Sequence, residues 1–178
     1  IHALLEERAD SAFTYDAVGA TRADLDAAPP GFRLDRYGAV VGAGRAVFDR
    51  CCVALGNLAN YPSSFMRIVR HPEEISEGSL FAPLVTHFGF VSVHPCRVIY
   101  TVREADCYGF GFGTLPGHAE SGEERFLIRL DGDVVHYEVQ AFSRPVGALP
   151  RLGAPIVRCF QRRFQRETVQ AMRDRARA

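Results

Sequence analysis

One histidine and three carboxylates gather in "GHAESGEE", residues 117–124. Here His118 stands close to Glu120, Glu123 and Glu124, and an imidazole beside carboxylates can act as a general acid or base. No second His lies at ligand spacing, so we expect no metal ion. Proline and glycine residues around the stretch predict a loop between two strands. We favour a structural or surface role, with polar ligand contact or acid–base catalysis by His118, Glu120 and Glu124 as the alternative.

The stretch upstream, "CYGFGFG" at 107–113, alternates glycine with aromatic residues. In a strand, Tyr108, Phe110 and Phe112 point to one face and the glycines to the other. A dinucleotide fingerprint requires G-x-G-x-x-G before a helix, whereas this spacing is G-x-G-x-G before "TLPG". Each glycine weakens a strand by roughly 0.5–1 kcal/mol, so we expect sheet curvature or the close approach of another backbone or a ligand to offset that loss. The aromatic rings are expected to fill the core or, alternatively, to line a ligand cavity.

Two arginines lie in largely apolar surroundings, Arg97 in "HPCRVIYTV" and Arg144 in "FSRP". A buried guanidinium needs a partner. The loop carboxylates could supply one, which favours a structural Arg–Glu pair. Recognition of an anion is the alternative.

The elements that must position these side chains follow from periodicity. Residues 33–42 predict a strand, and "RAVFDRCCVALGNLANYP", from residue 45, has apolar residues at helical spacing. From Phe65 the period changes to two. Short strands are predicted at 65–70, 80–93, 96–103, 107–115, 123–131 and 133–142.

The last two of these strands form the clearest motif, a hairpin over Asp131-Gly132. Its register places Phe126, Ile128 and Leu130 on one face with Val135, Tyr137, Val139 and Ala141. The other face carries Leu127, Arg129, His136, Glu138 and Gln140. One apolar and one polar face are typical of an antiparallel sheet covered on one side.

The C-terminal stretch returns to a period of 3.6 and predicts a helix over 150–176. Pro155 suits its first turn, and the arginines of this helix lie opposite an apolar stripe. Strands segregated from helices predict an α+β fold. We expect a curved antiparallel sheet of about six to seven strands gripping the C-terminal helix, in a single domain over 1–178 whose residues 1–31 form an N-terminal helix and loop extension.

Charge and cysteine usage narrow the functional classes. The formal net charge is zero and no aromatic residue is interleaved with the helix arginines, so we expect no nucleic-acid partner. No apolar run is long enough for a membrane span, and the first residues do not resemble a signal peptide. The five cysteines have no metal or redox spacing. They indicate reduced thiols in a cytoplasmic protein.

The motif G-T-L-x-G-H-x-x-x-G-E-E-x-F, together with "AFSRP" and the arginine-rich helix, resembles an uncharacterised family of bacterial and plant proteins known as a domain of unknown function. The likeness runs from about Tyr15 to Arg173. That family looks like part of the START and pollen-allergen helix-grip superfamily, whose members bind lipids, steroids or polyketides, or act as cyclases or hydrolases. Members often carry Trp after the first long helix. This chain has none, so Phe65 or Tyr61 would take any such aromatic role.

The leading hypothesis is a protein that binds a small apolar or amphipathic ligand, with one polar or anionic group, between sheet and helix. The expected ligand contacts are Tyr108, Phe110, Phe112, Tyr137, Arg97, His118 and Arg144. One alternative is a cyclase- or hydrolase-like enzyme with His118 as general acid or base. Another is a partner-docking scaffold with a filled core. We expect no cofactor, and the sequence leaves a homo-oligomer open.

Overall fold

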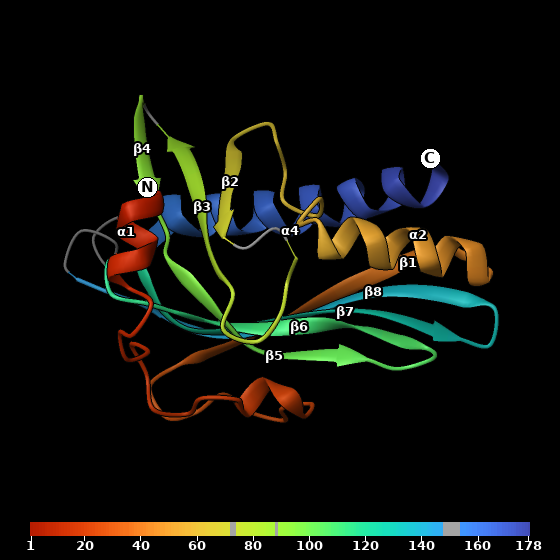
Figure 1. Ribbon diagram of the computed structural model, residues 1–178, viewed down its shortest axis with the longest axis horizontal. Coiled ribbons are helices and arrows are strands. Elements are labelled where there is room, and N and C mark those ends of the chain that lie inside the picture. Colours follow the sequence, from red (N-terminus) through yellow and green to blue (C-terminus); the bar gives the residue numbers. More distant parts are fainter. Residues whose placement is uncertain (72–73, 88, 148–153) are drawn as a thin grey trace.

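The computed structural model describes residues 1–71, 74–87, 89–147 and 154–178. Among these residues an antiparallel sheet curls around a long C-terminal helix (Figure 1). The strands are β1 (Arg33–Ala43), β2 (Met66–His71), β3 (Leu80–His87), β4 (Phe90–Val93), β5 (Cys96–Arg103), β6 (Cys107–Thr114), β7 (Glu120–Asp131) and β8 (Val134–Pro145). The helices are α1 (His2–Glu7), the 3-10 helix η1 (Ala20–Arg22), α2 (Arg45–Gly56) and α4 (Ala154–Arg177).

The sheet order is β1-β8-β7-β6-β5-β3-β2, with β4 beside β3. The predicted β7–β8 hairpin is confirmed, because Phe126 pairs with Val139 and Ile128 with Tyr137. Its turn contains Gly132, whose φ of 58° suits a tight hairpin turn. This order places β7, β6 and β5 at the centre of the sheet and β1 and β2 at its edges.

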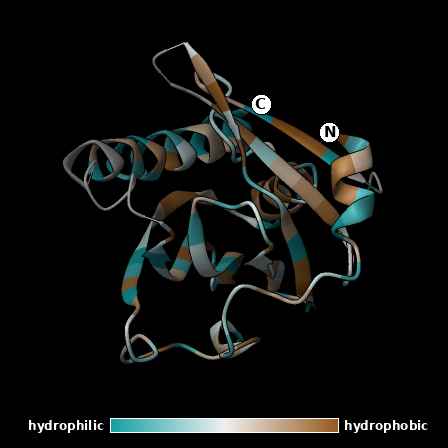
Figure 2. Ribbon diagram, turned by 90° about the vertical axis from the view of Figure 1, so that its left-hand side faces the viewer, coloured by the Kyte–Doolittle hydropathy of each residue, from teal (hydrophilic) through white to brown (hydrophobic). Residues whose placement is uncertain are grey.

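Helix α4 lies across the concave face of the sheet, alongside α2 (Figure 1). Its apolar stripe includes Phe164 and the fully buried Met172, and its buried Thr168 bonds a strand residue below. Apolar and polar residues alternate along the helix and the strands (Figure 2), as expected of elements covered on one side. The predicted α+β helix-grip architecture is therefore confirmed.

The N-terminal segment between α1 and β1 covers the opposite, convex face (red to orange in Figure 1). On this face the glycines of β6 make room for aromatic side chains of β5 and of the N-terminal segment. A Cβ on Gly111 would lie 2.3 Å from the Tyr100 ring, and one on Gly113 would lie 2.2 Å from the Tyr15 hydroxyl. The missing side chains thus allow aromatic side chains, rather than the expected backbone or ligand, to approach the strand closely.

Two boundaries differ from the prediction. The stretch 80–93 is two strands, because the chain turns at Gly89 (φ 80°) and β4 folds back on β3. The carboxylates of 120–124 lie in strand β7 rather than in a loop, because the strand begins at Glu120, which pairs with Pro145. The turn residues that suggested a longer loop are confined to the connection before it.

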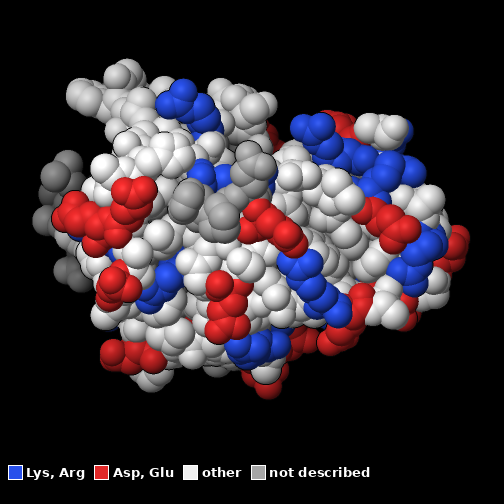
Figure 3. All heavy atoms as spheres, viewed as in Figure 1, with Lys and Arg blue, Asp and Glu red and all other residues white. Residues whose placement is uncertain are grey.

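Surface charge follows the neutral composition. Acidic and basic side chains are interspersed over the face shown in Figure 3, and neither sign forms a continuous field there. In the described part of the chain no helix is long and apolar enough to cross a membrane.

Candidate functional site

A cavity of about 420 Å³ lies between the concave face of the sheet and the N-terminal half of α4. Strands β1 to β8 and α4 all contribute to its wall. Most of the wall is apolar, and its aromatic and aliphatic side chains include Tyr61, Phe65, Met66, Val85, Phe112 and Phe164. The core below α4 is therefore not filled, which does not fit the scaffold hypothesis.

Four acidic residues line the cavity: Asp35 from β1, and Glu120, Glu123 and Glu124 from β7. The Glu123 carboxylate is bonded by the N-terminal segment on the convex side, which leaves three carboxylates on the cavity wall. Strand register places two of them in one row, with β8 between them. Asp35 and Glu124 both pair with Ala141 of β8, so the three residues form one row across the sheet. The small Ala141 side chain leaves space between the two carboxylates. Phe112 of β6 pairs with Glu124 on its other side and continues the row.

Asp35 and Glu120 each have a partner. Arg33 donates from Nε to Asp35 Oδ2 at 2.9 Å. Gln161 of α4 donates from Nε2 to Glu120 Oε1 at 2.6 Å. Burial raises the pKa of Glu120, and the Gln161 hydrogen bond acts in the opposite direction. The helix is thereby tied to the acidic end of the cavity.

Within the described residues Glu124 forms no ion pair, and the Tyr37 hydroxyl lies near it without a formed hydrogen bond. Burial, followed by the charges of Glu120 and Asp35, raises the pKa of Glu124 to about 8. The nearby Tyr37 hydroxyl acts in the opposite direction, yet it is itself buried without a hydrogen-bond partner among these residues. An acid that titrates near neutral pH can donate or accept a proton on the cavity wall.

His118 also faces the cavity, with its Nδ1 accepting a hydrogen bond from the Glu120 backbone N–H at 2.9 Å. Its ring meets the His94 ring edge to face, with centroids 4.7 Å apart. Burial, followed by the neighbouring His94, lowers the pKa of His118 to about 3. The imidazole is therefore neutral at pH 7, and with Nδ1 accepting, its proton lies on Nε2.

Of the residues expected to contact ligand, the structure brings Phe112 and His118 to the cavity. The other three aromatic residues do not line it. Phe110 is fully buried in the core, and the Tyr108 hydroxyl lies against Gly56 at the end of α2. Tyr137 reaches below α4, where its hydroxyl bonds Thr168 at 2.9 Å. These three aromatic residues pack in or against the main hydrophobic core instead.

The two arginines lie elsewhere as well, and neither forms the expected pair with a loop carboxylate. Arg97 stacks over Phe13 at 4.4 Å and bonds the Ala9 carbonyl, so it holds the N-terminal segment. Arg144 stacks over Phe32 at 4.6 Å. Their strand positions, one residue out of phase with the cavity-facing side chains, direct both to the convex side of the sheet.

Sequence reasoning missed Asp35, Tyr37 and His94, although one signal was present. In "RLDRYGAVV" the period of two places Asp35 and Tyr37 on the face that must be apolar, and a carboxylate there marks a cavity or a buried pair. Phe65 and Tyr61, named as substitutes for the absent Trp, do line the cavity. Among the described residues no group of three or more His, Cys, Asp or Glu is arranged to hold a metal ion.

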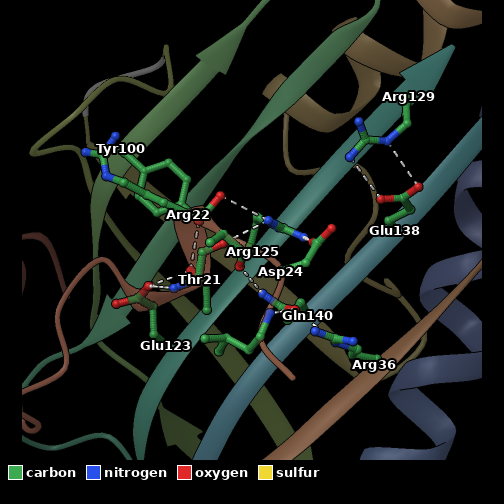
Figure 4. A network of polar contacts seen from close by, with 12 residues as sticks. Thr21, Arg22, Asp24, Arg36, Tyr100, Glu123, Arg125, Arg129, Glu138 and Gln140 are labelled. Carbon is green, nitrogen blue, oxygen red and sulfur yellow. Dashed lines mark hydrogen bonds and ion pairs between the residues drawn. The ribbon is translucent and has the colours of Figure 1, made fainter. Parts of the chain in front are cut away.

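The convex face carries a second polar cluster, which the sequence did not indicate (Figure 4). Glu123 accepts hydrogen bonds from Tyr15 Oη (2.8 Å), the Gly19 N–H (2.7 Å), and both the backbone N–H (2.8 Å) and the hydroxyl of Thr21. Arg125 pairs with Asp24 and donates to the Thr21 carbonyl. These contacts fasten the N-terminal segment to the sheet.

Known proteins resemble this chain in sequence and in fold. A family model described as a domain of unknown function, DUF1990, matches residues 14–171. The chain belongs to the DUF1990 family. A UPF0548 protein of Deinococcus radiodurans is 36% identical over 156 residues, covering 80% of this chain and 78% of that protein. One from Arabidopsis thaliana is 29% identical over 163 residues, covering 88% and 79%.

Solved structures add the fold. The chain resembles the Zhui aromatase/cyclase from a Streptomyces species with a TM-score of 0.60 at 12% identity, covering 82% of this chain and 94% of that one. At this identity the likeness shows a shared helix-grip fold. It agrees with the architecture described above.

Proposed function

We propose that this protein binds a small, largely apolar ligand in the cavity between the sheet and α4. The observation that carries the proposal is the cavity itself, whose volume of about 420 Å³ lies within the range of small-molecule sites. Its walls combine aromatic and aliphatic side chains with a few polar groups at one end. Phe112, Tyr61 and Phe164 would contact the apolar part of the ligand. His118, which offers a neutral N–H, would contact a polar atom.

The expected anionic group on the ligand is not supported. Three carboxylates stand on the wall, and no Arg from the described residues does. An anion would find no cationic side chain among the described residues of the wall, and any ionised carboxylate there would repel it. We therefore assign the polar end of the cavity to a group that is neutral or positively charged.

A second candidate is an enzyme that uses the same cavity, favoured by the Glu124 pKa of about 8, which suits acid–base catalysis near neutral pH. His118 is a poor candidate for a general acid, because its pKa of about 3 keeps it unprotonated. Turnover of a bound ligand that is lost in Glu124→Gln and kept in His118→Asn would favour this candidate over simple binding.

The binding proposal is tested with N-phenyl-1-naphthylamine, a neutral apolar dye that becomes fluorescent in apolar sites. We expect saturable binding to one site per chain. Native mass spectrometry of freshly purified protein would show whether a small molecule is retained. Absence of saturable dye binding, together with a mass equal to that of the bare chain, would contradict the proposal.

A further inference from the structure

Of the three carboxyl groups at the acidic end of the cavity, only Asp35 forms an ion pair within the described residues. Asp35 is paired with Arg33 and Glu120 is bonded by Gln161, so each has a fixed role in the wall. Glu124, in the same row of the sheet as Asp35, has neither an ion pair nor a formed hydrogen bond in the described part of the chain. A carboxylate enclosed by protein is unfavourable unless a cation or hydrogen-bond donors reach it.

The strand geometry keeps nearby arginines away from Glu124. Arg125, the next residue, points to the convex face, where it is committed to Asp24 and the Thr21 carbonyl. Arg33 is committed to Asp35 and Gln161. A cationic partner for the ionised Glu124 would therefore have to come from a ligand in the cavity.

Two aromatic residues lie near the Glu124 carboxylate. Phe112 is its cross-strand neighbour on β6, and Tyr61 is close enough for Glu124 to contribute to raising the Tyr61 pKa. The Tyr61 ring in turn packs on Phe164 of α4, with centroids 5.6 Å apart. A carboxylate with aromatic rings nearby can recognise an organic ammonium group, through a charge-assisted hydrogen bond and cation–π attraction.

We propose that the ligand carries a basic nitrogen, which binds as an ammonium to the Glu124 carboxylate while the apolar remainder lies against Phe112, Tyr61 and Phe164. Asp35 and Glu120 strengthen the negative potential at this position. The inference rests on the proposed function, and it specifies the ligand class of that same cavity. The competing class is a neutral ligand whose carbonyl or hydroxyl bonds a protonated Glu124.

Three probes that share one apolar body separate these classes: 2-(2-naphthyl)ethylamine, 2-(2-naphthyl)ethanol and 2-naphthylacetate. At pH 8.5 Glu124 is largely ionised and the amine is still protonated. We expect the amine to bind at least about tenfold more tightly than the alcohol, and the carboxylate more weakly than both. Equal or weaker binding of the amine than of the alcohol would overturn the inference.

Glu124→Gln removes the charge at nearly constant volume, and Glu77→Gln, at an exposed position, is the matched control. In Glu124→Gln the amine affinity should fall at least about tenfold while the alcohol affinity changes less than about twofold. Glu77→Gln should bind all three probes like the unaltered protein. An equal loss for amine and alcohol in Glu124→Gln would contradict charge recognition. The comparison of probes in the unaltered protein does not depend on either variant.

Proton release provides an independent readout. Below pH 8 Glu124 is mostly protonated, so an ammonium group that binds there must displace the proton. Titration calorimetry at pH 6.5, in two buffers of different ionisation enthalpy, measures this proton release. We expect nearly one proton released per amine bound and none for the alcohol. The other titratable groups around Glu124 are the following: Asp35 and Tyr37 on β1, Tyr61 after α2, His94, Cys96 on β5, His118, Glu120 on β7 and Tyr137 on β8.

The outcomes distinguish this inference from the proposed function. If neither the neutral dye nor any of the three probes binds, both are wrong. If the dye and the alcohol bind but the amine has no advantage, the cavity binds ligands and only the assignment of a basic nitrogen is wrong.

Discussion

Glu123 and Glu124 are adjacent on β7, yet their carboxylates lie on opposite sides of the sheet, and only that of Glu123 is hydrogen-bonded by the protein. Glu123 is 2% exposed and accepts four hydrogen bonds from the N-terminal segment. Glu124 stands on the cavity wall without a full hydrogen bond in the described structure. Strand alternation alone produces this division. One carboxylate therefore holds the fold together, and the other is available to a ligand.

Replacing Glu123 by Gln should destabilise the protein strongly. The amide nitrogen would turn a donor toward the Gly19 N–H, which then loses its acceptor in a buried site. A loss of about 2–4 kcal/mol is expected for such an unsatisfied group next to a lost charge, and each kcal/mol lowers the Tm by roughly 2–4 °C in a chain of this size. Calorimetry measures the shift. Hydrogen exchange should accelerate in residues 14–24, which Glu123 fastens.

The control for this variant is Glu138→Gln in the same convex-face cluster. Glu138 is partly exposed and contacts Arg129 at 3.3 Å. An exposed pair of this kind contributes little, so its Tm should change by no more than about 2 °C. Similar Tm losses in the two variants would argue against a special role for Glu123.

Glu124→Gln should have the opposite effect, and one that depends on pH. The folded-state pKa of Glu124, about 8, lies above the ordinary glutamate value, so the folded state holds this proton more tightly than the unfolded chain. Its contribution to stability is fully present below about pH 4.5 and is lost as the pH rises through 8. We expect Glu124→Gln to match the unaltered protein near pH 4.5 and to have a Tm several degrees higher at pH 8.5. A lower Tm at pH 8.5 would show that the carboxylate is stabilised by a partner.

The architecture could be predicted from the sequence because it depends on local patterns. The period of two around Asp131-Gly132 defines both faces of the β7–β8 hairpin, and the change to 3.6 defines α4. The site could not be predicted to the same extent. Whether Phe112 or Phe110 meets the cavity depends on how far α4 stands from the sheet, which periodicity does not encode.

The carboxylates were misplaced for a related reason. Turn residues around His118 suggested a solvated loop, but pairing with β8 extends β7 back to Glu120. Long-range pairing decides such a boundary, and a single sequence shows only local turn preferences. The glycines of β6 were expected to allow curvature or the approach of a backbone or ligand, whereas the groups that approach Gly111 and Gly113 are the rings of Tyr100 and Tyr15. Tyr100 comes from the neighbouring strand β5, and Tyr15 comes from a distant segment that no local pattern connects to the strand.

His118→Asn should flatten the acid side of the stability curve. Because the folded-state pKa of His118 is lowered to about 3, its neutral form contributes stability that is present above about pH 6.5 and lost as the pH falls toward 3. The Asn oxygen can accept the Glu120 N–H in place of Nδ1 without taking up a proton. Between pH 6.5 and 4, the Tm of the variant should fall less steeply than that of the unaltered protein. His136→Asn, on the opposite face of the sheet, should retain the steep slope, and the same steep slope in His118→Asn would contradict the lowered pKa.

Ala141→Leu tests the cavity without altering any charged group. Ala141 lies in the row between Asp35 and Glu124 and faces the cavity, so a leucine side chain would project into the empty space above the two carboxylates. Filling a cavity with apolar atoms preserves the fold, at a stability change of less than about 1.5 kcal/mol where space is available. We expect dye and amine binding to weaken at least about tenfold while the circular dichroism spectrum and the Tm stay close to those of the unaltered protein. Ala105→Leu, in the exposed turn between β5 and β6, adds the same atoms outside the cavity and should bind both molecules normally. Undiminished binding in Ala141→Leu would mean that these ligands occupy another part of the molecule.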